Sequence, residues 1–156
     1  LHDSTETRRW TGQAQVQRGE GVVARLIGWI IGFPDASPEV PVNVVLAYKP
    51  HGELWTRDFA GKTFSSFQQR GTGKDEHLLV ERFGPINVAL ALVVDNDRLF
   101  LIPRRWSCLG IPLPGFLLPQ GQSFETEQDG KFCFDVEIAA PLVGLIVAYK
   151  GILLPS

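Results

Sequence analysis

Turn signals recur about every ten residues along the chain and divide it into short runs of strand-forming residues. Asp129-Gly130 lies between two alternating runs and predicts a tight hairpin turn, and Asp95-Asn96-Asp97 is of the same kind. Regular spacing of this type is typical of an antiparallel sandwich or barrel. The expected strands lie near 8–18, 41–49, 53–59, 62–69, 77–83, 86–95, 98–106, 121–128, 131–139 and 145–154.

Two of these runs indicate how their faces are covered. KFCFDVEI, residues 131–138, places Phe132, Phe134, Val136 and Ile138 on one face, which predicts one buried and one wet face. NVALALVV, residues 87–94, is apolar on both faces. We therefore expect it to be a central strand covered on both sides, with a helix as the cover on one of them.

One stretch breaks the strand pattern: GVVARLIGWIIGFP, residues 21–34. Its bulky apolar residues recur at helical spacing, which predicts a helix over 20–32 that packs on the sheet by this stripe. Gly32 and Pro34 are placed to end it. A bilayer span needs about 20 apolar residues, and this shorter stretch is interrupted by Arg25, so no transmembrane segment is expected. The stripe consists of Val22, Val23, Leu26, Ile27, Ile30 and Ile31.

Two questions about this helix stay open at the level of sequence. It is either a static plug in the barrel or a movable lid. The glycines on its other face are expected where a backbone or a ligand comes close, because a glycine inside a helix costs about 1 kcal/mol relative to alanine.

Composition bounds the class of protein. We expect the 156 residues to form one domain, 1–156. The sequence begins with leucine and contains no methionine, which predicts that it is a piece of a longer chain. A net charge of −2 argues against a nucleic-acid partner.

The two cysteines, Cys108 and Cys133, are expected to be free thiols in a reducing compartment; one disulfide bridge between them is the alternative. We expect a cytoplasmic protein. Since no metal-ligand spacing occurs, no metal and no cofactor are expected.

The run ELWTRDF supplies the candidate ligand-binding residues. Glu53, Trp55, Arg57 and Phe59 share one strand face, because alternate residues point the same way. If that face is the inner one, a paired Glu53 and Arg57 beneath two aromatic rings would hold the polar end of a ligand. The alternative is an edge strand whose charges reach solvent.

Two further segments bear on the site. Arg25 and Trp29 of the helix are candidate ligand contacts. So is Phe116 in GIPLPGFLLPQG, residues 110–121, an irregular apolar segment. This segment is a cap that folds back on the barrel, a pocket rim or a contact for a partner domain.

The order of these features resembles that of the bacterial domain-of-unknown-function family 4166. The resemblance covers nearly the whole chain, and its most specific parts are E-x-W-x-R-x-F with the following Gly and Phe, and W-x-x-x-G-x-P-L-P. Members similar to this sequence occur alone or behind dehydrogenase-like and epimerase-like nucleotide-binding domains. The resemblance implies an accessory role and provides no catalytic residue.

We predict a mainly β fold, an antiparallel barrel or strongly curved sheet of about ten strands with one helix between the first strand and the second. This order is similar to that of lipocalin-like and fatty-acid-binding-protein-like barrels; a half-closed sheet wrapped on the helix is the alternative. The expected function is non-catalytic binding of an apolar small molecule or lipid. One alternative is an accessory domain that docks to a nucleotide-binding enzyme domain. The other is an enzyme with Glu53 or Glu81 as acid or base.

Overall fold

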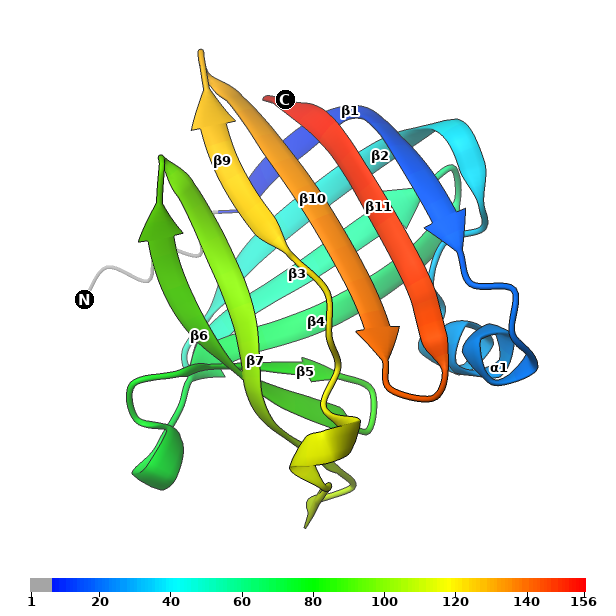
Figure 1. The fold of residues 1–156 in the computed structure, drawn as a ribbon. Coiled ribbons are helices and arrows are strands. Elements are labelled where there is room, and N and C mark those ends of the chain that lie inside the picture. Colours follow the sequence, from blue (N-terminus) through cyan, green and yellow to red (C-terminus); the bar gives the residue numbers. More distant parts are fainter. Residues whose placement is uncertain (1–6) are drawn as a thin grey trace.

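The computed structural model describes residues 7–156, which form a closed antiparallel β-barrel of ten strands with one extra strand (Figure 1). Strands neighbour one another in the order β6-β5-β4-β3-β2-β1-β11-β10-β9-β7, and pairing of β6 with β7 closes the ring. The short β8 pairs with β7 alone. The elements are β1 (Thr7–Arg18), α1 (Val22–Ile31), β2 (Ser37–Lys49), β3 (Gly52–Phe59), β4 (Lys62–Arg70), η1 (Gly73–Asp75), β5 (Leu79–Phe83), β6 (Ile86–Asp95), β7 (Arg98–Cys108), β8 (Ile111–Pro112), η2 (Gly115–Leu117), β9 (Phe124–Gln128), β10 (Lys131–Ala140) and β11 (Gly144–Pro155).

The ten predicted strand runs all correspond to barrel strands, and only β8 was not predicted. The two predicted tight turns are confirmed, since Asn96, Asp97, Asp129 and Gly130 all have positive φ angles between 50° and 77°. That is the conformation that two-residue hairpins of the primed type require. The ring is closed because the long β6–β7 hairpin bridges the two ends of the strand order, so the half-closed alternative is wrong.

Aromatic side chains fill the part of the interior that β1, β3, β4, β10 and β11 surround. The rings of Phe59 and Phe64 stack at 5.9 Å, and both meet Tyr149 edge to face at 5.5 and 6.1 Å. Phe134 lies 5.8 Å from Tyr149 as well. Such pairs contribute about 0.5–1.5 kcal/mol beyond the burial of their area.

The two face predictions have different outcomes. Phe134 is buried and its three alternate neighbours pack against the core, so the alternation of 131–138 is confirmed. For 87–94 burial is confirmed only for the first half, because Val94 and its two predecessors are exposed. The helix that was expected to cover this strand packs against β11 instead. Strand β5 ends its pairing opposite Leu90, and beyond that point β6 lacks that neighbour.

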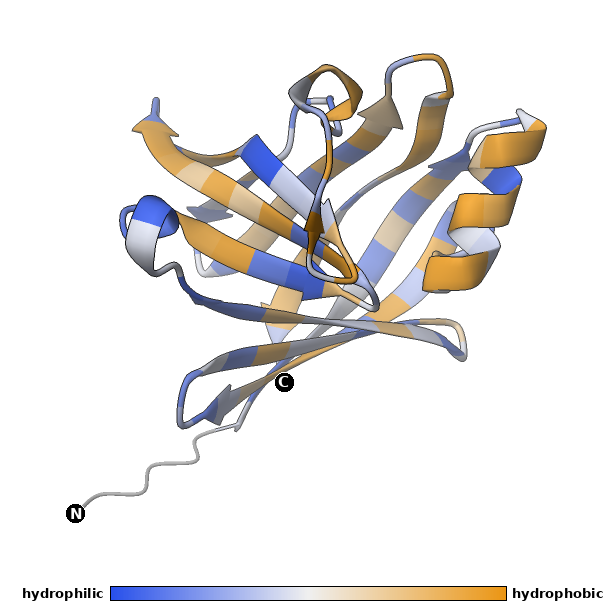
Figure 2. Ribbon diagram, turned by 90° about the horizontal axis from the view of Figure 1, so that it is seen from below, coloured by the Kyte–Doolittle hydropathy of each residue, from blue (hydrophilic) through white to orange (hydrophobic). Residues whose placement is uncertain are grey.

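Helix α1 occupies the predicted place but faces the other way. Gly32 has φ 86° and its N–H donates to the Gly28 carbonyl at 3.0 Å, which confirms the predicted end. The buried residues of the helix are Ala24 and Gly28, and Ile27 and Ile31 are partly buried. The predicted packing stripe is wrong for its other four members, Val22, Val23, Leu26 and Ile30, which are exposed. Figure 2 shows that the ribbon of α1, at the right-hand edge of the molecule, is mainly hydrophobic.

Close approach explains why small residues form the packing face of α1. A Cβ atom at Gly28 would lie 1.9 Å from Nη2 of Arg18, and a Cβ atom at Gly19 would lie 3.2 Å from Cβ of Ala24. Gly28 thus has a close neighbour, but it is the Arg18 side chain and not the backbone or ligand that was expected. Bulky residues on this face would hold the helix away from β1 and β11, so they lie on the outer face instead. No helix within residues 7–156 has the length and apolarity to cross a bilayer.

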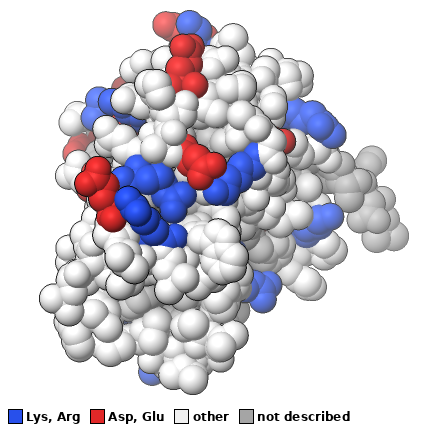
Figure 3. Space-filling model, turned by 90° about the vertical axis from the view of Figure 1, so that its right-hand side faces the viewer, with Lys and Arg blue, Asp and Glu red and all other residues white. Residues whose placement is uncertain are grey.

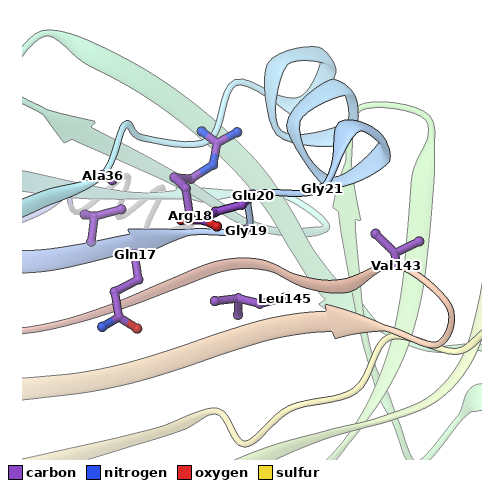
Figure 4. A pocket seen from close by; sticks show the side chains of 9 residues that line it. Gln17, Arg18, Gly19, Glu20, Gly21, Ala36, Val143 and Leu145 are labelled. Carbon is purple, nitrogen blue, oxygen red and sulfur yellow. The ribbon is translucent and has the colours of Figure 1, made fainter.

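Arg18 joins the end of β1 to the segment that follows α1. Its Nη1 donates to the carbonyls of Phe33 at 3.2 Å and Pro34 at 3.0 Å. Figure 4 shows this side chain among the residues of an open groove beside the start of α1. Since Arg18 is used to anchor this segment, we assign the groove a structural role.

Candidate functional site

A cavity of about 250 Å³ lies inside the barrel, on the side of β5, β6 and β7. Its walls are mainly apolar and include Ile31, Phe83, Val88, Leu101 and Ile138. Ligand pockets for drug-sized molecules start at about 300 Å³, so this cavity lies slightly below that range. The aromatic core therefore fills the barrel only in part.

The cavity extends to a place where two strands separate. β7 pairs with β9 at only two positions, Leu99 with Glu125 and Phe100 with Phe124. The segment before β9 then follows β10 instead, since Gln120 exchanges backbone hydrogen bonds with Ala139 at 2.7 and 2.8 Å. Residues 119–121 and the facing part of β7 line the cavity there. The widened seam leaves space that strand pairing would otherwise occupy.

A hydrogen-bonded polar cluster lies in the wall of the cavity. The Arg57 guanidinium (β3) donates from Nη1 to Oγ of Ser66 (β4) at 3.0 Å, and this hydroxyl donates to Oε1 of Glu81 (β5) at 2.6 Å. Gln68 donates to the same oxygen at 3.2 Å, and Arg57 Nη2 lies 3.6 Å from it. Because Arg57 and Glu81 are both largely buried, their opposite charges compensate each other inside the barrel.

Two further polar groups face the cavity from the opposite wall, Glu125 on β9 and Tyr149 on β11. Neither side chain forms a hydrogen bond with another described residue. Burial raises the pKa of Glu125 above its ordinary value; nearby Arg57 opposes the shift and Glu81 adds to it. Burial likewise raises the pKa of Tyr149 to about 12. Burial in this wall therefore makes ionisation of both groups less favourable than in water.

Replacement of Glu125 by glutamine tests this assignment through the pH dependence of stability. A raised pKa in the folded state means that stability is greatest below the ordinary pKa of 4.5. It is lost as pH rises through the folded pKa. We expect the free energy of unfolding of Glu125→Gln, relative to that of the wild type, to rise as pH increases from about 4.5 and to level off above the folded pKa. Urea unfolding at a series of pH values measures this difference.

The control for this prediction is Glu127→Gln, which changes an exposed carboxylate on the same strand. It should leave the pH dependence of wild-type stability unchanged. A difference between Glu125→Gln and the wild type that does not vary with pH would contradict the assignment.

The candidate residues of the ELWTRDF run are only partly brought together. Arg57 faces inward as expected, and Phe59 is buried in the aromatic core. Glu53 does not pair with Arg57, because it accepts a hydrogen bond from Nε1 of Trp55 at 3.2 Å, and Glu81 takes the arginine instead. β3 lies between β2 and β4, so the edge-strand alternative is wrong. Arg57 and Trp55 also line a recess of about 40 Å³ beside the main cavity.

The other three candidates lie on the outside of the barrel. Arg25, Trp29 and Phe116 are exposed and do not line the cavity. The two parts of segment 110–121 lie in different places. Its end, residues 119–121, lines the cavity. Its earlier part is held against β7 by a hydrogen bond from Nε1 of Trp106 to the Pro114 carbonyl, at 3.1 Å. Contact of these three residues with a ligand stays a prediction.

Sequence reasoning missed Glu125 and Tyr149 and left Glu81 ambiguous. A signal for Glu125 exists in the hairpin at Asp129-Gly130. A two-residue turn pairs Phe134 with Glu125 across the strands, and directly opposite residues share a face. Since Phe134 faces inward, Glu125 does too. The corresponding signal for Glu81 is ambiguous. The short turn between β5 and β6 pairs it with Val88, but residues 87–94 are apolar on both faces, so this pairing does not identify the inner one.

These features define the class as a closed antiparallel β-barrel domain with a partly polar internal cavity. The sequence model of the Domain of unknown function (DUF4166) family matches residues 1–153, so the chain belongs to this family. Comparison with curated proteins and with solved structures yields no match. Within residues 7–156, no group of three or more His, Cys, Asp or Glu side chains is placed to hold a metal ion.

Proposed function

We propose that the domain is a non-catalytic binding module for an apolar small molecule or lipid that occupies the internal cavity. The observation that carries this proposal is an apolar cavity whose polar groups converge from strands β3, β5, β9 and β11. Pockets with mainly apolar walls and a few placed polar groups are the usual form of small-molecule sites. The apolar part of the ligand would lie against β6 and β7.

The polar end of the ligand is neutral in this proposal. Arg57 is already balanced by Glu81, so no free positive charge remains to compensate a ligand carboxylate. The Tyr149 hydroxyl can donate a hydrogen bond, and burial shifts Glu125 towards its protonated form, which can donate a second. A carbonyl, ester or hydroxyl group suits these donors. A fatty acid in its ionised form does not.

The size of the cavity limits how the ligand is held. At about 250 Å³ it encloses a small molecule, or one part of a longer one. A long acyl chain would extend through the widened seam between β7 and residues 119–121. The ligand would then be anchored by its polar end.

The first experiment is native mass spectrometry of the domain purified gently from a bacterial host, followed by organic extraction. We expect a bound mass that leaves on extraction. The binding of Nile red, a neutral apolar dye, is measured in parallel on the extracted protein. Absence of any bound mass together with absence of dye binding would overturn the proposal.

A matched pair of variants locates the binding. Val88→Phe fills the cavity from β6 and should weaken dye binding at least tenfold. Val94→Phe makes the same change at an exposed position of the same strand and should leave binding unchanged. Thermal unfolding of both variants verifies that they fold. Equal binding by a folded Val88→Phe would place the dye outside the cavity.

Two alternatives stay predictions. An accessory domain would bind a nucleotide-binding enzyme domain through exposed residues of 110–118. In an enzyme, Glu53 or Glu81 would act as acid or base. Of these two carboxylates only Glu81 lines the cavity, and its Oε1 already receives hydrogen bonds from Ser66 and Gln68.

A further inference from the structure

Exposed apolar side chains gather at one end of the barrel on three separate segments. These are α1, the turn between β10 and β11, and the region of β8 and η2, which all lie at the lower end in Figure 1. Leu142 at the β10–β11 turn is 97% exposed, and Trp29 and Phe116 are 76% and 73% exposed. We name this set the apolar rim; it comprises Val22, Leu26, Trp29, Ile111, Phe116 and Leu142.

The apolar rim surrounds the end at which the cavity lies. Ile27 and Ile31 line the cavity from the inner face of α1, the helix whose outer face carries Leu26 and Trp29. Likewise, the residues that follow η2 line the cavity, as do Ala140 and Ile146 on either side of the Leu142 turn. A molecule that leaves the cavity at this end therefore meets the rim.

Charge is almost absent from the segments that form the rim. Residues 21–34, 106–124 and 138–149 contain no acidic residue, and Arg25 is their single charged residue. Figure 3, which faces the side with α1, shows charged groups gathered in the upper half and few in the lower half. Protein interfaces usually surround an apolar centre with a polar rim, a pattern that these segments lack.

These observations favour a lipid surface as the occupant. Tryptophan and arginine close together on an exposed helix face, with leucine and valine beside them, suit the boundary between headgroups and acyl chains. Apolar tips on three separate elements fit a deformable surface into which each can insert. The absence of acidic residues avoids repulsion from anionic headgroups.

We infer that this end of the barrel docks peripherally on a lipid bilayer through the apolar rim, so that a ligand passes between the cavity and the membrane. The inference rests on the proposed function for the identity of what is passed. Docking itself needs only the rim. Insertion of the three tips would bury their apolar side chains, and Arg25 would lie near the phosphates.

Vesicle flotation tests the docking. We expect the domain to float with vesicles of phosphatidylglycerol and phosphatidylethanolamine, and the double variant Trp29→Asp/Leu142→Asp to lose at least tenfold in partition coefficient. Both replaced side chains are exposed, so the double variant should keep the wild-type melting temperature. Arg25→Gln should reduce binding to these vesicles about fivefold and have no such effect on phosphatidylcholine vesicles.

The matched control is Val94→Asp. Val94 is also exposed but lies near the β6–β7 turn, at the opposite end of the barrel in Figure 1. It should float like the wild type. Equal flotation of the rim variant and the wild type would overturn the inference. A wild type that does not float but forms a dimer broken by Trp29→Asp/Leu142→Asp would also overturn it and make the rim an interface between copies.

The outcomes for docking and for ligand binding are separable. A bound mass in native mass spectrometry without flotation would overturn docking and leave the proposed function in place. Flotation that depends on the rim, without any bound mass or dye binding, would support docking and overturn the proposed function.

Discussion

Replacement of Arg57 by methionine should destabilise the domain by about 3–5 kcal/mol, the largest effect we expect from any single substitution. The change leaves the Glu81 carboxylate inside the barrel without its cation, although Ser66 and Gln68 still donate to it. The side chains of Arg57 and Glu81 are only 14% and 9% exposed, so water compensates little of the loss. Urea unfolding at neutral pH measures the change.

The double variant Arg57→Met/Glu81→Gln is the control for this expectation. It removes both charges and should be clearly more stable than Arg57→Met alone, because no isolated buried charge remains. Additive losses in the two single variants and the double variant would show that the ions do not compensate each other. A loss below about 1 kcal/mol in Arg57→Met would place the pair in contact with solvent.

Replacement of Leu153 by alanine should cost about 2–5 kcal/mol. Leu153 is fully buried on the inner face of β11, opposite Gly12 of β1 and Phe132 of β10. Truncation there removes apolar contacts and leaves a cavity in the core. The change in the free energy of unfolding from denaturant titration tests it.

The neighbouring residue supplies the control, since Leu154 is half exposed on the other face of the same strand. Leu154→Ala should cost less than about 1 kcal/mol. A reversed order of the two losses would mean that β11 is shifted by one residue, because a one-residue shift exchanges the faces of a strand.

Local signals were sufficient for the strands and their connections. Asp129-Gly130 and Asp95-Asn96-Asp97 favour the left-handed backbone of a two-residue hairpin, and both turns are found where expected. The alternation of 131–138 marks its inner face for the same local reason, since successive side chains point to opposite sides. The end of the helix at Gly32 is equally local.

The orientation of α1 could not be predicted from local sequence signals. Its apolar stripe predicts the buried face only if burial of bulky side chains decides the packing. Here the approach to β1 and β11 decides it, because Arg18 and Gly19 leave room only for Ala24 and Gly28. Arg18 and Gly28 are ten residues apart in the chain, and only the folded structure brings them together.

The chain by itself thus determines an antiparallel barrel with one helix after the first strand, and it places Arg57 among the inward candidates. Only the tertiary structure decides that Glu81 is the partner of Arg57 and that Glu125 and Tyr149 face the same cavity. It also decides that most of the apolar stripe of α1 is exposed. The reason is that turn geometry and alternation act between neighbours in sequence. Charge pairing, cavity shape and helix packing depend on strands that meet only when the ring closes.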